Sequence, residues 1–164
     1  MHRYAVALGS NLGNRLGYLR RGVELLKQEV GALDLLLSRV YDTDPLGGPV
    51  GQGAYLNAAT VFRSELEPTE VLERLLDIER REGRVRRQPN DPRTLDLDLL
   101  LCDNLRLERP GLVIPHPRMH LRAFVLAPLA DIAPGWVVPG LDQSVEALLG
   151  KLDTAGIRPT DLRL

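Results

Sequence analysis

Residues 92–101 read Pro92-Arg93-Thr94-Leu95-Asp96-Leu97-Asp98-Leu99-Leu100-Leu101. Leucine alternates with a polar residue through most of this stretch, and side chains alternate between the two faces of a β-strand. We therefore predict a strand over residues 94–101. Its core face should carry Leu95, Leu97, Leu99 and Leu101, and its opposite face should carry Thr94, Asp96 and Asp98.

This strand completes a series of elements that the preceding sequence predicts. Apolar runs and helical spacing indicate, in chain order, a strand at 3–8, a helix at 14–30, strands at 33–42 and 55–63, and a helix from 68 to about 83. The order strand-helix-strand-strand-helix-strand is typical of a ferredoxin-like unit. We predict an α+β fold, a ferredoxin-like antiparallel sheet with helices packed mainly on one face. The stretches 44–54 and 84–93 should be loops, and further helices are expected near 118–130 and 143–152.

The overall composition limits the functional classes. The chain has 164 residues, 44% of them hydrophobic and 26% charged, as in a folded globular protein. We predict a single catalytic domain over residues 1–164. A net charge of −1 gives no general attraction to nucleic acid or acidic membranes. The single cysteine, Cys102, fits a reducing compartment, and no apolar run reaches the ~18–20 residues of a membrane helix, so we expect a cytoplasmic protein.

Asp96 and Asp98 are the sharpest candidates for chemistry. Their carboxylates would lie ~7 Å apart along one strand face and would repel each other without a nearby cation. Magnesium suits such oxygen ligands, because it commonly takes one or two carboxylates and completes its shell with water and phosphate oxygens. The alternative is the solvated outer face of an amphipathic strand. Aspartate is a poor strand former, which favours the functional interpretation.

Arginines cluster in the loop before this strand, at Arg84, Arg86 and Arg93. The aspartates would repel a bare anion, but an anion that arrives with metal could accept forked hydrogen bonds from guanidinium groups. Metal, carboxylates and arginines together are typical of phosphoryl transfer. A salt-bridge network between loop and strand is the alternative.

Three other residues could contact a ligand. His116 lies between two prolines, on a stiff backbone that suits a phosphate contact. Tyr55 and Asn57 share one face of their predicted strand, so an aromatic ring and an amide could bind a flat ring with hydrogen-bonding edges. All three could equally be structural or rim residues.

Several blocks occur in the order and spacing of one known family. They are Gly9-Ser10-Asn11-Leu12-Gly13, Tyr55-Leu56-Asn57-Ala58, Gly83-Arg84-Val85-Arg86, the run from Pro92 to Asp98, and Pro115-His116. Up to about residue 134 the sequence resembles the 6-hydroxymethyl-7,8-dihydropterin pyrophosphokinases of folate biosynthesis. That family has a ferredoxin-like core, in agreement with the predicted fold.

The resemblance implies specific roles for individual residues. It implies two magnesium ions, held by Asp96 and Asp98, and catalytic roles for Arg84, Arg93, Asp96 and Asp98. It implies ATP contacts for Arg84, Arg93, Leu100, His116 and Arg122, with Leu100 beside the adenine. It implies pterin contacts for Thr43, Pro45, Leu46, Tyr55, Asn57 and Phe124. Arg86 falls on a mobile-loop position, and Glu79 falls at a helix end near the catalytic centre.

Two departures from the family pattern stand out. The loop that feeds the aspartate strand reads Arg87-Gln88-Pro89-Asn90-Asp91 and lacks the tryptophan that relatives often carry there. The only tryptophan is Trp136, far along the chain. Asp44 occupies a position where a second proline is common.

The implied reaction transfers a pyrophosphoryl group from ATP to the pterin hydroxymethyl group and releases AMP. The expected partners are ATP and 6-hydroxymethyl-7,8-dihydropterin, with no nucleic acid and no membrane, and a monomer is favoured. One alternative is a nucleotidyltransferase, which would release pyrophosphate. Another is a non-catalytic RNA-binding domain, but aromatic residues make up only 4% of the chain, which gives little support for base stacking.

Overall fold

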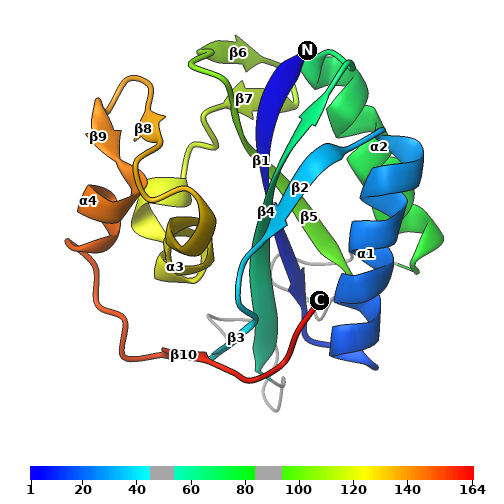
Figure 1. Ribbon diagram of the computed structural model, residues 1–164, viewed down its shortest axis with the longest axis vertical. Coiled ribbons are helices and arrows are strands. Elements are labelled where there is room, and N and C mark those ends of the chain that lie inside the picture. Colours follow the sequence, from blue (N-terminus) through cyan, green and yellow to red (C-terminus); the bar gives the residue numbers. More distant parts are fainter. Residues whose placement is uncertain (45–53, 84–93) are drawn as a thin grey trace.

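A computed structural model describes residues 1–44, 54–83 and 94–164 (Figure 1). Its main sheet has the strand order β10-β3-β4-β1-β5, with β2 also paired to β4, and these pairs are antiparallel. The strands are β1 (His2–Ser10), β2 (Leu33–Leu37), β3 (Tyr41–Thr43), β4 (Tyr55–Ser64), β5 (Asp96–Cys102) and β10 (Ile157–Pro159). The helices are α1 (Arg15–Glu29), α2 (Pro68–Arg81), α3 (Ala123–Ile132) and α4 (Val145–Leu149). The predicted α+β class with an antiparallel ferredoxin-like sheet is confirmed.

Three smaller elements follow β5. A hairpin of β6 (Leu107–Arg109) and β7 (Leu112–Ile114) precedes a single 3-10 turn, η1 (Met119–Leu121). A second short hairpin pairs β8 (Val137–Val138) with β9 (Gln143–Ser144). The helix expected near 118–130 therefore starts at Ala123, after the η1 turn. None of the described helices is long and apolar enough to cross a membrane.

The two faces of the sheet carry separate cores. The two longer helices, α1 and α2, cover one face, and α3 with α4 lies on the other (Figure 1). Alternate residues of β1 divide between the cores: Tyr4, Val6 and Leu8 pack toward α1 and α2. Ala5 and Ala7 pack toward α3. The central strands are therefore buried on both faces, which explains why β1 is a nearly continuous apolar run.

The prediction for Leu101 was wrong, because β5 contains an irregularity. Leu99 pairs with Val6 but Leu101 pairs with Ala5, so one extra residue lies on β5 between these pairs. Such a β-bulge shifts the alternation of side chains by one position. Leu101 therefore packs in the core beside α3, whereas Leu99 packs, as predicted, with α1 and α2.

The strand predicted over 33–42 is interrupted. It divides into β2 and β3, and Ser38 lies between them, where its hydroxyl accepts a hydrogen bond from the Ala59 backbone N–H at 2.8 Å. Next to it, Arg39 and Tyr41 both bond the Asp131 carboxylate of α3. These side-chain bonds lie at the interruption between β2 and β3.

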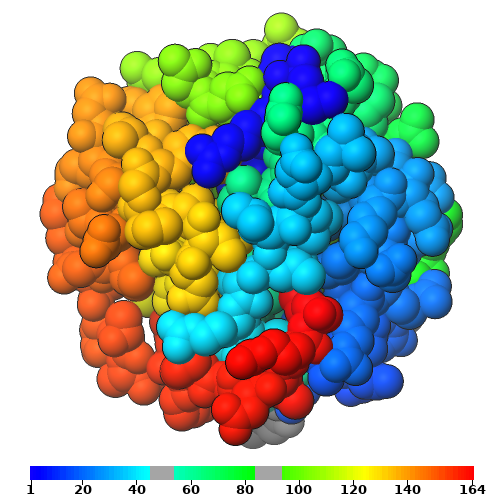
Figure 2. All heavy atoms as spheres, viewed as in Figure 1, coloured from blue at the N-terminus to red at the C-terminus, as the bar shows by residue number. Residues whose placement is uncertain are grey.

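The last residues of the chain lie along the sheet. β10 pairs with β3, and the segment after it runs toward α1, where the Arg20 guanidinium donates to the Arg163 carbonyl at 2.7 Å. Figure 2 shows this C-terminal segment packed between the chain near β3 and α1. The C-terminal residues thus belong to the folded body.

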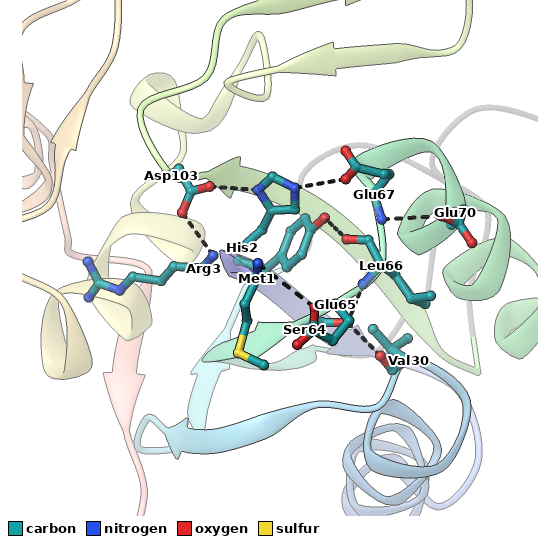
Figure 3. A network of polar contacts seen from close by, with 11 residues as sticks. Met1, His2, Arg3, Val30, Ser64, Glu65, Leu66, Glu67, Glu70 and Asp103 are labelled. Carbon is teal, nitrogen blue, oxygen red and sulfur yellow. Dashed lines mark hydrogen bonds and ion pairs between the residues drawn. The ribbon is translucent and has the colours of Figure 1, made fainter.

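His2 joins the start of β1 to two distant carboxylates (Figure 3). Its Nδ1 lies 2.8 Å from Asp103 Oδ2, and its Nε2 lies 3.2 Å from Glu67 Oε1. The Asp103 carboxylate also accepts a hydrogen bond from the Arg3 backbone N–H. The bonds to Asp103 and Glu67 raise the pKa of His2 above its ordinary value.

This raised pKa makes the stabilising contribution of His2 depend on pH. A group with a higher pKa in the folded state stabilises it fully below its unfolded pKa, about 6.5 for histidine, and stops doing so as pH rises through the folded value. We expect His2→Gln to lower the melting temperature most near pH 5.5 and least above pH 8. Thermal unfolding of both proteins across this range measures the difference. A loss of melting temperature that does not change with pH would contradict the prediction. His120→Gln, outside this network, is the control.

Candidate active site

Asn57 and the two aspartates lie on one face of the sheet. Gly9 of β1 lies opposite Asn57 of β4 on one side and opposite Asp96 of β5 on the other. Ala7, which packs toward α3, lies opposite Asp98 in the same way. Directly opposed residues of an antiparallel pair point to the same face, and neighbouring strands are ~4.8 Å apart, so the backbones at Asn57 and Asp96 lie about 10 Å apart.

Gly9 leaves the space between these residues open. A Cβ atom at Gly9 would lie 3.0 Å from Asn57 Nδ2 and 3.8 Å from Tyr55 Cδ1. The first distance is shorter than ordinary van der Waals contact, so a side chain here would displace the Asn57 amide. The glycine forms a flat floor between an amide on one side and a carboxylate on the other.

The aspartate strand is held by α2. The backbone N–H of Leu97, between the two aspartates, donates to Glu79 Oε2 at 2.8 Å. β5 is the last strand at its end of the described sheet, so this N–H has the helix rather than another strand as its neighbour. The Glu79 side chain is buried, and the Thr94 hydroxyl bonds the Glu82 carbonyl nearby at 2.7 Å.

Sequence reasoning pointed to Glu79 only through the family resemblance. Its position does contain a local signal, because Leu75, four residues earlier, and Ile78, directly before it, are buried residues of α2. A carboxylate on the apolar face of a helix needs a hydrogen-bond donor when buried. The sequence could not identify that donor as the Leu97 N–H.

The other side of the floor carries buried polar groups. Thr43 of β3 lies opposite Tyr55, and Tyr41 lies opposite Asn57, so these side chains share the face described above. Thr43 and Asn57 are both buried. Within the described ranges, Thr43 Oγ1 and Asn57 Oδ1 have no hydrogen-bond partner. Buried polar atoms are costly unless they are bonded, so these two atoms are suited to a ligand that carries hydrogen-bonding groups.

His116 is neutral at pH 7. Burial lowers its pKa to about 4, with further lowering by Arg122 and Arg118, although Asp96 acts in the opposite direction. The Arg118 backbone N–H donates to His116 Nδ1 at 3.2 Å, which assigns the ring proton to Nε2. The His116 backbone N–H bonds the Leu100 carbonyl at 2.9 Å and so fixes the residue beside β5. His116 can therefore donate one hydrogen bond from Nε2.

Arg122 and Phe124 lie together at the start of α3. The Arg122 Cζ atom is 5.6 Å from the centroid of the Phe124 ring, a cation–π contact. Phe124 packs at the edge of the core between the sheet and α3, whereas Leu100 is fully within that core. A cation and an exposed part of an aromatic ring thus adjoin the face that carries the aspartates.

The structure does not describe every predicted site residue. Those on the described face or at its edge are Thr43, Tyr55, Asn57, Asp96, Asp98, Leu100, His116, Arg122 and Phe124. Pro45, Leu46, Arg84, Arg86 and Arg93 lie outside the described residues, as does the loop that lacks tryptophan. The described part of the site therefore has three polar regions around Gly9. One carries the two aspartates, one carries Asn57 and Thr43, and one carries His116 and Arg122.

The chain is similar to known proteins over most of its length. The family model for 7,8-dihydro-6-hydroxymethylpterin-pyrophosphokinase (HPPK) matches residues 5–134. The 2-amino-4-hydroxy-6-hydroxymethyldihydropteridine pyrophosphokinase of Bacillus subtilis is 46% identical over 127 residues, 77% of this chain and 75% of the relative. The protein of the same name from Synechocystis is 39% identical over 158 residues, 96% of this chain and 80% of the relative.

A solved structure shares the fold at low sequence identity. The wild-type HPPK-DHPS of Plasmodium falciparum superposes with a TM-score of 0.71 at 14% identity. The match covers 92% of this chain but only 44% of that longer chain. At this identity the likeness concerns the fold alone.

Proposed function

This chain belongs to the 7,8-dihydro-6-hydroxymethylpterin-pyrophosphokinase family, and from this premise we propose roles for its individual residues. It is a pyrophosphokinase of folate biosynthesis. The reaction transfers a pyrophosphoryl group from ATP to the hydroxymethyl group of 6-hydroxymethyl-7,8-dihydropterin and leaves AMP. The attacking hydroxyl oxygen forms a bond to the β-phosphorus, and the bond from that phosphorus to the α-phosphate oxygen breaks.

Asp96 and Asp98 hold magnesium, and we assign two ions to them. The support is their donor set: two partly exposed carboxylates on one strand face, which suit a hard cation that also binds phosphate oxygens. Bound magnesium supplies positive charge that offsets the charge of the triphosphate. The Leu97–Glu79 bond keeps the strand between the two carboxylates in place.

Thr43, Tyr55 and Asn57 bind the pterin, together with Phe124. The observation that carries this assignment is the pair of buried polar atoms, Thr43 Oγ1 and Asn57 Oδ1, without partners in the described ranges. A pterin ring is flat and has hydrogen-bond donors and acceptors along its edge, which can bond these two buried atoms. We also assign this pocket Pro45 and Leu46 from the family pattern.

His116 and Arg122 bind the triphosphate, and Leu100 lies beside the adenine. His116 is a neutral donor through Nε2, so it contacts a phosphate oxygen without adding charge. Arg122 adds a fixed positive charge at the same edge, which stabilises charge on the phosphate oxygens as the bond to phosphorus breaks. The family pattern adds Arg84 and Arg93 as catalytic arginines that also contact ATP.

Product analysis tests the reaction. The purified protein, incubated with ATP, magnesium and 6-hydroxymethyl-7,8-dihydropterin, should form AMP and the pterin diphosphate in equal amounts. AMP formation should depend on the pterin. Release of pyrophosphate with a pterin–nucleotide product would instead identify a nucleotidyltransferase and overturn the assignment.

We further propose that residues 1–164 form one catalytic domain that acts as a monomer in the cytoplasm. The support for one domain is the pairing of β10 with β3 and the hydrogen bond from Arg20 of α1 to the Arg163 carbonyl, which join both ends of the chain to the same body. Size-exclusion chromatography with light scattering measures the oligomeric state.

A further inference from the structure

Residues 156–160, which contain the edge strand β10, border the proposed pterin site. The Asp44 backbone N–H donates to the Gly156 carbonyl at 3.0 Å. At the other end, the backbone N–H and the hydroxyl of Thr160 both donate to the Val40 carbonyl, at 2.9 and 2.8 Å. These bonds lie just before and just after β3, on the edge of β3 that faces away from β4.

A side-chain pair reinforces the backbone bonds. The Arg158 guanidinium donates to Asp44 Oδ1 at 3.0 Å and lies 4.0 Å from Asp42 Oδ2. Asp44 thus contributes both its backbone N–H and its carboxylate to the C-terminal segment. A residue without a backbone N–H and a carboxylate at position 44 could not make both contacts.

The segment is in register with the residues assigned to the pterin. Ile157 lies opposite Thr43, and Thr43 lies opposite Tyr55 on its other side. β3 is only three residues long, so few ladder bonds to β4 can fix its position. The bonds to residues 156–160 therefore contribute a large share of the contacts that hold Thr43 in place.

We propose that residues 156–160 act as a clasp that positions Thr43 for the pterin, with Arg158 and Asp44 as its positioning pair. The proposal rests on the pterin site assigned above. The clasp contacts β3 and not β5, so it affects pterin binding and leaves ATP binding unchanged. The Arg158–Asp44 pair is exposed, with 51% and 61% of the side chains accessible, so its loss alone should have a modest effect.

The test compares the Michaelis constants for the two substrates. We expect Arg158→Ala and Asp44→Ala each to raise KM for the pterin about three- to five-fold, at the upper end of what an exposed ion pair contributes. KM for ATP and kcat at saturating pterin should stay within about two-fold. Arg158→Lys should retain most of the affinity because it keeps the charge. The double alanine variant should be no worse than Arg158→Ala, which already removes the ion pairs with both Asp44 and Asp42.

Arg63→Ala is the matched control. Arg63 forms a comparable exposed pair with Asp34 at 3.4 Å, at the opposite end of β4, and its loss should leave both KM values unchanged. Equal increases in both KM values, or an additive double variant, would overturn the clasp. Asn57→Ala separates this result from failure of the pterin site. If it raises KM for the pterin and Arg158→Ala does not, only the clasp is wrong; if neither does, the pterin assignment fails and the clasp falls with it.

Discussion

Replacing Asp96 or Asp98 with alanine should lower kcat by about 10³-fold or more while the protein remains folded. Both carboxylates lie on the face that carries Asn57, and neither is a core side chain. Without one of them, the metal that offsets the triphosphate charge loses a ligand.

The measurement is steady-state turnover over a range of magnesium concentrations, with circular dichroism to establish folding. Asp103→Asn is the matched control, because Asp103 directly follows the other end of β5 and bonds His2 and Arg3. It should affect stability and leave kcat nearly unchanged. Wild-type turnover in either Asp96→Ala or Asp98→Ala would refute the metal assignment.

Replacing Glu79 with alanine should lower both stability and turnover. The Leu97 N–H would lose its acceptor in a buried site, which costs about 1–3 kcal/mol of unfolding free energy. The peptide between the two aspartates would then be free to shift, and a displacement of about 1 Å in a catalytic group can cost about 10²-fold in rate. We therefore expect kcat to fall by about that factor, with a weaker apparent affinity for magnesium.

Glu79→Gln distinguishes a positioning role from a need for charge. Glutamine keeps an acceptor oxygen for the Leu97 N–H, so it should recover most of the turnover and most of the magnesium affinity. Unfolding by urea and magnesium titration of turnover measure the two effects separately. If the glutamine variant is as poor as alanine, the carboxylate charge matters more than the hydrogen bond to Leu97.

The local pattern of the sequence was sufficient for much of the fold and part of the site. Alternation along 94–99 placed Asp96 and Asp98 on one face of the strand and Leu95, Leu97 and Leu99 on the other face, as the structure shows. It also placed Tyr55 and Asn57 together on one face. Strand alternation and helical spacing are properties of the backbone over a few residues, so they can be read without knowledge of the partner strands.

Other features depended on neighbours that are distant in the sequence. The alternation broke down at Leu101, because the bulge arises from how β5 pairs with β1. The core beside α3 was not apparent either, since its members come from both β1 and the C-terminal half of the chain, such as Ala5 and Leu126. Side-chain alternation along a strand indicates which residues share a face, but only the packing of the folded chain shows which elements cover that face.

By itself, then, the sequence determined the order of the main helices and most strands, the face of the aspartates and, through its family motifs, the chemistry. Only the tertiary structure decided how those groups are held: the Leu97 N–H by Glu79, and β3 by residues 156–160. The physical reason is that N–H and C=O groups at a sheet edge must find partners, whichever segment supplies them. That choice depends on which distant segments meet in space, and no local pattern encodes it.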